Sequence, residues 1–414
     1  MRKNNTINVL YIDGDGPLGG ASRSLYELIG GFDPNAVHPY FFTSKGTASI
    51  FYEKIAVDNI SVRGMSKFDH TRYGYYRGWR WLILLREFFY FPFMIFGLIK
   101  AAHQWKQIDV IHLNEFVYIL PAIIAKKIFS VPLVVHVRAL AKGREGGIRS
   151  FIFNWILKHF ADVVVAIDGN VRKTLPENLN VLVVNNSFSP GQERGDRRII
   201  DIFHAIPQEK FKAGFVGNLH KSKGILEIVE AAKIIHQKNS NVHFVIAGGE
   251  TARVENLKGW FLKKFGFSQN SQNEMINFIE KNNLQNCVSL TGFTMAIGDV
   301  YKNIDVLLFP SHFDAPGRPV FEAGFYSKPS IIAANNPTSD TFRDGVTGIL
   351  VPEKSPNVLA EAVLYLANNP KICAAMGAEA KKLAEENFCP QRNARKILNI
   401  YRRLKSGSGE IYDL

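Results

Sequence analysis

The stretch FPSHFDAPGRPVFEAGFYSKPSIIA, residues 309–333, decides the fold of this 414-residue chain. An apolar run that ends at Phe309 predicts a buried strand. A loop rich in Pro, Ser, Asp and Gly follows, and a short helix is predicted from Pro319, where a missing N–H costs nothing. Pro329 ends that helix, and residues 330–333 predict another buried strand. Strand, loop, helix and strand in this order form the repeating unit of a parallel sheet.

Two carboxylates stand in this unit, Asp314 and Glu322, with seven residues between them. A helix N-terminus has free N–H groups and binds phosphate readily, so the backbone amides of Gly317 and Val320 are predicted phosphate ligands. A carboxylate in the first turn can accept hydrogen bonds from sugar or ribose hydroxyls. Arg318 could reach a phosphate or a sugar, or it could be a solvated capping residue.

Short apolar strands alternate with helices along most of the chain, which predicts parallel sheets covered on both faces. Strands are predicted at 7–12, 109–112, 132–136, 162–167 and 181–184, and again at 212–216, 242–247, 288–290, 306–309 and 330–333. The polar, Gly- and Pro-marked segment between the two series predicts a linker. The fold class is therefore α/β, with two doubly wound units whose ligands bind beyond the carboxyl ends of the strands.

Composition narrows the classes of function. The net charge of +13 favours anionic partners, which include nucleotide phosphates and acidic membrane surfaces. No module for binding RNA or DNA is visible, so nucleic acid is disfavoured. The three cysteines show no disulfide or metal spacing, which fits a reducing compartment. The start of the chain lacks the apolar core of a signal peptide, so a cytoplasmic location is expected.

The chain resembles the retaining glycosyltransferases of family GT4. Their pattern at this place is Glu, seven residues, Glu, so Asp314 is one methylene shorter than expected and Glu322 matches. The resemblance implies the GT-B fold, two Rossmann-like doubly wound domains that face a cleft, with a C-terminal helix crossing back to the first domain. The expected parts are an acceptor-side domain at 1–187 with the crossover helix 390–404, a linker at 188–209, a nucleotide-sugar-binding domain at 210–389, and a mobile tail at 405–414.

The loop between the first strand and helix carries Gly19 and Gly20, which would let the backbone approach a diphosphate or donor sugar closely. The spacing of its glycines is not the G-x-G-x-x-G pattern of dinucleotide-binding proteins, so NAD is disfavoured. Asp13 and Asp15 have the spacing of a metal motif from a different glycosyltransferase fold, so no metal and no other cofactor are expected here. The resemblance places His136 near the donor sugar, and the residue stands at the end of a predicted strand, facing the cleft.

The loop that opens the second unit reads Gly217-Asn218-Leu219-His220-Lys221-Ser222-Lys223-Gly224. In the family this loop carries an Arg and a Lys that neutralise the departing diphosphate. Lys223 matches the Lys, whereas Asn218 replaces the Arg. Either Lys221 or His220 supplies part of the missing charge, or stabilisation of the leaving group is weaker. Gly249, after the next strand, is expected to line the nucleotide pocket.

Residues 72–106 hold 12 of the chain's 50 aromatic residues, with six Lys or Arg and one acid. The apolar run from Trp81 approaches transmembrane length, but Arg86, Glu87 and Pro92 argue against a span. A helix lying in the membrane interface fits this composition, and a core helix of the first domain is the alternative. The expected membrane-contact residues are Trp79, Trp81, Phe88, Phe89, Phe91 and Phe93.

The resemblance implies transfer of a sugar from a nucleoside diphosphate sugar to an acceptor hydroxyl, with retention of anomeric configuration. His136, Asp314 and Lys223 are the expected catalytic residues. An acceptor linked to a lipid on the inner leaflet, in polysaccharide or glycolipid assembly, is the expected setting. A nucleotide-sugar epimerase on the same double fold and a non-catalytic nucleotide-sugar-binding protein are the alternatives.

Overall fold

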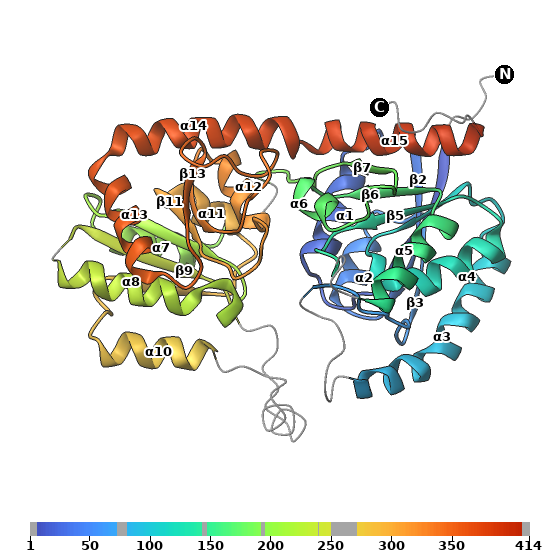
Figure 1. Ribbon diagram of the computed structural model, residues 1–414, viewed down its shortest axis with the longest axis horizontal. Coiled ribbons are helices and arrows are strands. Elements are labelled where there is room, and N and C mark those ends of the chain that lie inside the picture. The colour runs from blue at the N-terminus through green and yellow to red at the C-terminus, as the bar shows by residue number, and fades with distance from the viewer. Residues whose placement is uncertain are drawn as a thin grey trace. The chain divides into compact units, whose positions relative to one another are not determined.

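The structure, a computed structural model, describes residues 6–72, 81–142, 147–191, 195–238, 240–249 and 271–407. The chain divides into two compact units. Unit 1 comprises residues 1–189 and 388–414, and unit 2 comprises residues 190–387 (Figure 1). Residues 188 and 189, expected in a linker, belong to unit 1, and the helix α7 (Arg197–Ala205) occupies much of the rest of that segment. The segment reads as polar, yet Ile199 and Phe203 anchor α7 in unit 2 because both side chains are buried.

Unit 1 contains a seven-stranded parallel sheet with strand order β3-β2-β1-β4-β5-β6-β7. Its strands are β1 (Ile7–Asp13), β2 (Val37–Ser44), β3 (Asp58–Val62), β4 (Val110–Leu113), β5 (Leu133–Val137), β6 (Val163–Ala166) and β7 (Val181–Val183). Its helices are α1 (Gly20–Gly30), α2 (Thr47–Tyr52), α3 (Ile83–Gln104), α4 (Ile119–Phe129), α5 (Ile148–Phe160), α6 (Gly169–Lys173) and α15 (Pro390–Ser406). The strand order reverses between β1 and β4, and such a switch point is where ligands of open α/β sheets bind.

Unit 2 contains a six-stranded parallel sheet with order β10-β9-β8-β11-β12-β13. Its strands are β8 (Phe211–Val216), β9 (Val242–Ala247), β10 (Val288–Gly292), β11 (Val306–Phe309), β12 (Ser330–Ala333) and β13 (Gly348–Val351). Its further helices are α8 (Ile225–Gln237), α10 (Ser271–Lys281), α11 (Ile297–Asn303), α12 (Arg318–Phe325), α13 (Pro356–Asn368) and α14 (Pro370–Asn387). Here the switch point lies between β8 and β11. Both units are Rossmann-like, as the sequence predicts.

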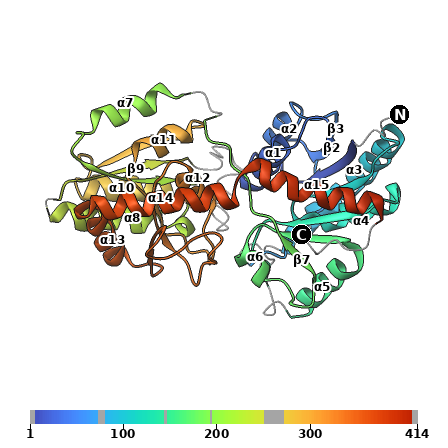
Figure 2. The same cartoon turned by 90° about the horizontal axis from the view of Figure 1, so that it is seen from above.

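The last helix, α15, belongs to unit 1 although it follows unit 2 in the chain (Figure 2). Its apolar stripe packs beside α1 and into the core of the first sheet, where Ile397, Ile400 and Tyr401 are fully buried. The helix begins directly after Cys389 with Pro390, whose fixed φ suits a first helical position. Burial of this stripe therefore holds the two ends of the chain together within one unit.

Candidate active site

The loop after β8 is held against the loop after β11 at the switch point of unit 2. Gly224 has a left-handed backbone with φ 75°, and a Cβ there would lie 2.0 Å from the carbonyl oxygen of Pro310. The amide of His312 donates to the carbonyl of Ser222 at 2.9 Å. Only glycine permits this contact, so Gly224 brings Lys223 up to the loop that leads into α12.

Lys223 lies between two aromatic rings, in an environment that is largely apolar. Its ammonium is 4.4 Å from the centre of the Phe313 ring and 5.2 Å from that of Phe309. Within the described part of the chain it has no ion pair with a carboxylate. Burial lowers the pKa of Lys223 to about 8. A partly desolvated ammonium of this kind can bind an anion strongly.

Glu322, the second acid of the motif, is buried in α12 and already accepts three hydrogen bonds or ion-pair contacts. Tyr301 of α11 donates to its Oε2 at 2.8 Å. Arg318, one helical turn earlier, contacts Oε1 at 3.0 Å through Nε and at 2.9 Å through a terminal nitrogen. Arg318 also lies 5.3 Å from the ring of Phe321. Arg318 is therefore paired with Glu322 rather than solvated, as the i,i+4 spacing allows, and its contact with a donor phosphate stays a prediction.

The N-terminus of α12 differs in part from the expected phosphate cradle. The amide of Val320 donates to the carbonyl of Gly317 at 3.1 Å, so this amide is used within the first turn. A Cβ at Gly317 would lie 2.6 Å from the Phe309 ring, which explains the glycine. Phe309 thus contacts both Lys223 and the start of α12, and these two parts of the candidate site share one aromatic ring.

Asp314, the shorter acid, lies in the loop before α12. Its Oδ1 accepts a hydrogen bond of 2.8 Å from Asn335, which follows β12. The carboxylate is thus held at the carboxyl edge of the sheet by a neighbouring loop. The structure places Asp314 in the same loop as Phe313, which lies over Lys223.

The two residues expected to replace the family's Arg do not provide a free positive charge. Lys221 pairs with Glu274 of α10 at 2.6 Å. His220 uses Nδ1 to accept from the amide of Ser222, and burial together with Lys223 lowers the pKa of His220. In this arrangement Lys221 is ion-paired and the lowered pKa of His220 favours its neutral imidazole, which favours the alternative of weaker leaving-group stabilisation at Asn218.

Backbone contacts join the loops after β8 and β9. A Cβ at Gly248 would lie 1.8 Å from the carbonyl oxygen of Gly217, so the backbones of the two loops are in direct contact. Gly249 follows and packs beside Phe293 of the loop after β10, whose ring is largely exposed. Gly217, Asn218 and Gly249 therefore lie at one edge of the sheet with Lys223.

In unit 1 the Gly-rich loop runs from β1 into α1. Gly19 is the N-cap of α1, and Gly19 and Gly20 are exposed. Asp13 is buried and accepts hydrogen bonds from Ser22 and Tyr52, so its role is structural. No cluster of His, Cys, Asp or Glu in the described ranges has the arrangement of a metal site.

His136 is buried, with 1% of its surface exposed, and does not face outward as expected. It is the fourth residue of β5 and lies beneath Arg138, whose guanidinium is 3.3 Å from His136 Nδ1. A guanidinium only donates, so Nδ1 is an acceptor and the ring proton lies on Nε2. His112 Nε2, 3.2 Å from the same Nδ1, must then donate, and its Nδ1 accepts from Tyr401 of α15 at 2.6 Å. Burial and Arg138 lower the pKa of both histidines, to about 3 for His112.

Glu115 is a candidate that the sequence patterns missed. It follows β4 at the switch point of unit 1, is nearly buried, and accepts from the amide of Phe116 at 2.9 Å. Burial and the nearby Asp15 raise the pKa of Glu115 to about 8. A carboxyl group with such a pKa beside a ligand-binding edge is typical of functional sites. A lone Glu after a strand has no local signal in the sequence, because burial by distant segments causes the shift.

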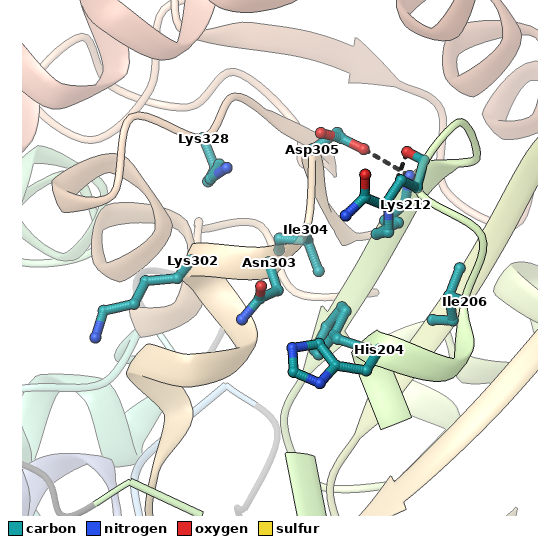
Figure 3. A pocket seen from close by; sticks show the side chains of 10 residues that line it. His204, Ile206, Lys212, Lys302, Asn303, Ile304, Asp305 and Lys328 are labelled. Atoms are coloured by element: carbon teal, nitrogen blue, oxygen red, sulfur yellow. Dashed lines mark hydrogen bonds between the residues drawn. The ribbon is translucent and has the colours of Figure 1, made fainter. Parts of the chain in front are cut away.

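Figure 3 shows a pocket elsewhere in unit 2, at the opposite, amino-terminal edge of the sheet. Lys212 lies near the start of β8, Asp305 precedes β11 and Lys328 precedes β12. Asp305 accepts from the amide of Lys212 at 2.7 Å. None of the predicted site residues lines this pocket, so it is separate from the candidate active site.

Within the aromatic segment, which the structure describes from residue 81 on, residues 83–104 form the helix α3, which continues through Pro92. Trp81, Phe88, Phe89, Phe91 and Phe93 are all exposed, and Trp79 lies outside the described residues. Only part of α3 enters the core, through side chains that include Met94 and Leu98. Among the described helices, none combines the length and the apolar character that a membrane span requires.

Comparison with known proteins extends these findings. Residues 196–383 match the family profile described as "Glycosyl transferases group 1", and residues 18–186 match "Glycosyltransferase Family 4". The capsular polysaccharide biosynthesis glycosyltransferase CapM of Staphylococcus aureus is 24% identical over 216 residues, 52% of either chain. The poly(ribitol-phosphate) alpha-N-acetylglucosaminyltransferase of S. aureus strain COL is 22% identical over 189 residues, 45% of this chain and 34% of that protein. The chain spans about half the length of the curated relatives it matches, or less.

The solved structure of HepE from Anabaena in complex with UDP is similar in fold, with a TM-score of 0.72 at 18% identity over 94% of this chain and 98% of that one. Sucrose-phosphate synthase from Thermosynechococcus elongatus gives a TM-score of 0.71 at 15% identity over 97% of this chain and 100% of that one. Two Rossmann-like units in tandem, with this strand order, define the GT-B class of fold. The two family profiles together cover most of the chain, which belongs to the family 4 (group 1) glycosyltransferases.

Proposed function

We propose that this protein transfers a sugar from a nucleoside diphosphate sugar to an acceptor hydroxyl. The observation that carries the proposal is Lys223 at the switch point of unit 2, an ammonium that has no carboxylate partner among the residues the structure describes. A diphosphate is the anion that such a site in a parallel sheet suits best. HepE, which has the same fold, is described in complex with UDP, with UDP and glucose, and with UDP-glucose. The name of CapM supports a role in polysaccharide biosynthesis.

The proposed reaction retains anomeric configuration by departure of the leaving group on the front face. The bond from C1 of the sugar to the diphosphate oxygen breaks, and the acceptor oxygen bonds to C1 on the same face. The acceptor's proton passes to the departing diphosphate oxygen. The alpha linkage in the name of the ribitol-phosphate relative supports this stereochemistry, because common donors such as UDP-glucose are α-linked. Analysis of the anomeric configuration of the product by NMR tests this step.

Each residue of the site has a role in this proposal. Lys223 and backbone amides of the loops after β8 and β11 balance the charge of the departing diphosphate, and no bound metal ion is required. Glu322 holds the ribose through its remaining acceptor capacity, and Asp314 holds a hydroxyl of the donor sugar. His136 lies behind Arg138 and is a positioning residue. We expect the rate of transfer to be unchanged in EDTA.

The proposed acceptor is linked to a lipid on the cytoplasmic face of a membrane, where the protein binds peripherally. The exposed aromatic side chains of α3 support this setting, since Trp and Phe beside Arg are typical of helices in a membrane interface. Assembly of a surface polysaccharide or a glycolipid is the process that such an acceptor serves.

The variants Lys223→Ala and Glu322→Gln test the function. Glu322→Ala is unsuitable, because it leaves Arg318 and Tyr301 without their buried partner and would cost roughly 3 kcal/mol of stability. We expect Lys223→Ala to lower the rate of transfer by about 100-fold, as the loss of one preorganised charge contact does. Lys238→Ala, an exposed substitution just beyond the end of α8, is the matched control.

The assay measures release of UDP, GDP or ADP from a panel of nucleotide sugars, with and without a sugar acceptor. Rates near wild type in both site variants would sink the assignment. Conversion of the donor in the absence of an acceptor, to an isomer with its diphosphate intact, would point to an epimerase. Donor binding without turnover in any combination would indicate a binding protein.

A further inference from the structure

We propose that α5 joins α3 in one apolar, basic face of unit 1 that binds an anionic lipid bilayer beside the ligand-binding edge of the sheet. The α3–α5 face consists of Leu85, Phe88 and Phe96 from α3 and Ile148, Phe151 and Trp155 from α5. The proposal rests on the membrane-associated acceptor of the proposed function. Beyond the proposed function, it states that a second helix binds the bilayer, which side of unit 1 faces the bilayer, and that the lipids bound are anionic.

Helix α5 has an apolar stripe that no other described element of unit 1 covers. Ile148, Phe151, Ile152 and Trp155 follow the i, i+3, i+4, i+7 pattern of one helix face. Ile148 is 79% exposed and Phe151 is 72% exposed, values that match Phe88 and Phe96 of α3 at 74% and 70%. The core contacts of α5 come from its other side, through Phe153 and Leu157. The exposed stripe is therefore additional to what the fold of unit 1 requires.

Arg149 links the starts of α3 and α5. Its guanidinium lies 5.3 Å from the Phe68 ring and 5.9 Å from the ring of Trp81, which directly precedes α3. It also donates to the carbonyl of Asp69. Two aromatic rings and one backbone carbonyl thus hold the first turn of α5 near the beginning of α3.

Helix α4 lies between the two, as Figure 1 and Figure 2 both show. It packs on α3, and its Lys126 donates to the carbonyl of Phe160 at the end of α5, at 2.9 Å. Leu120 and Ile128 of α4 are also exposed, so apolar side chains continue across the layer. The three helices present one surface.

The charge of this surface selects its partner. The helices α3, α4 and α5 carry six Lys or Arg and a single acid, Glu87. Glu87 is buried and pairs with Arg86 at 2.6 Å, and Lys126 pairs with Asp162 at 2.6 Å, so the positive charge of the face comes mainly from the other four basic residues. Arg63 lies beside the same face, over the rings of Phe89 and Phe93. Basic residues around exposed Phe and Trp favour the headgroup layer of an anionic bilayer over a neutral one.

The α3–α5 face lies beside the carboxyl edge of the first sheet. The buried Glu87 of α3 accepts from the amide of Lys67, in the segment that leaves β3, at 2.7 Å. Ser150 of α5 lies 3.2 Å from His70 of the same segment, and the amide of Phe68 donates to Val117 just beyond β4. The first turns of both helices therefore pack on the segment that borders the switch point, so a headgroup bound there is close to the Gly-rich loop.

Vesicle co-sedimentation tests this inference with the full chain. The α5 variant Phe151→Gln with Trp155→Gln is compared with the α3 variant Phe88→Gln with Phe96→Gln. The matched control replaces two exposed apolar residues of unit 2, Val358→Gln with Tyr365→Gln. The vesicles contain phosphatidylcholine either alone or mixed with phosphatidylglycerol. All four α3 and α5 positions are exposed, so the variants are expected to keep the wild-type melting temperature.

We expect either pair to lower partitioning onto phosphatidylglycerol vesicles by about tenfold or more, and the control to change nothing. Wild type should bind phosphatidylcholine alone much more weakly. Full binding by the α5 variant, with loss only in the α3 variant, would overturn the role of α5 and leave the proposed function intact. Equal binding to both lipids would overturn the charge argument. Reversible dimerisation abolished by the α5 variant, without vesicle binding, would show that the face binds protein.

Transfer to a soluble acceptor separates this inference from the proposed function. The α5 variant should retain wild-type activity on a free sugar acceptor and lose it on an acceptor embedded in vesicles. Loss of activity on both acceptors would assign these residues to the site itself. Absence of transfer by wild type on every acceptor would reject the proposed function. The co-sedimentation result would still decide whether the α3–α5 face binds anionic lipid.

Discussion

At the scale of single residues, the site depends on how each charge is balanced. Glu322 is neutralised by Arg318, Lys221 by Glu274, and His220 is uncharged near pH 7. Lys223 is left without a carboxylate partner in the described chain. The charge that a diphosphate would meet in unit 2 thus comes mainly from one ammonium, and its protonation should govern binding.

Binding of UDP should therefore weaken as the pH rises through the pKa of Lys223, which is about 8. The lowered pKa favours the neutral amine in the free protein, and a bound diphosphate raises it again. Affinity should change little close to pH 7 and fall by up to about tenfold per pH unit above 8. Calorimetry at pH 8 in two buffers of different ionisation enthalpy should detect proton uptake on binding.

Lys223→Arg is the control, because an arginine stays charged throughout this range. Its affinity for UDP should be independent of pH between 7 and 9. A wild-type affinity that does not change with pH, without proton uptake at pH 8, would contradict the role assigned to Lys223.

At the scale of elements, α15 is anchored in the core of unit 1 by the buried side chain of Tyr401. Replacing Tyr401 with Phe removes the hydroxyl that lies 2.6 Å from His112 Nδ1 and leaves that buried acceptor without its partner. We expect a loss of roughly 1–3 kcal/mol in the free energy of unfolding, measured by chemical denaturation. Arg402→Ala, an exposed neighbour on the same helix, should change the stability little. Equal effects of the two substitutions would refute the buried hydrogen bond.

The elements also show what the sequence can and cannot predict. Strands β8, β9, β11 and β12 were predictable because each is a predominantly apolar run between turn residues. Strand β2 was not, because Pro39 stands inside it and argues against a strand paired on both sides. Strand β3 has only two apolar residues in five, which is too few for a clear pattern.

The same distinction holds for the site. The Asp314 and Glu322 spacing and the glycines of the loops could be read from the sequence. The Arg318–Glu322 pair follows from i,i+4 spacing and could also have been predicted. The contacts of Tyr301, Glu274 and Tyr401 could not, because tertiary packing brings those residues from distant elements. The pKa of Glu115 depends on burial in the same way.

At the scale of the whole molecule, each unit has its own sheet, switch point and core. A fragment of residues 190–387 should fold alone, because it contains the six-stranded sheet and the helices that cover it. The fragment should unfold cooperatively and bind UDP through Lys223. Circular dichroism and calorimetry measure both properties. An unfolded fragment would contradict the independence of unit 2, and a folded one that ignores UDP would place essential donor contacts elsewhere.

The discontinuous makeup of unit 1 has a consequence for synthesis on the ribosome. The strands of its sheet leave the exit tunnel early, but α15, which packs beside α1, is translated only after unit 2. At usual rates of elongation the intervening part takes roughly 10–40 s to make. During that interval the apolar surface around Tyr11 and His112 is not covered by α15, so nascent chains should bind chaperones until α15 emerges. Unit 2, encoded as one uninterrupted block, can complete its folding before unit 1 does.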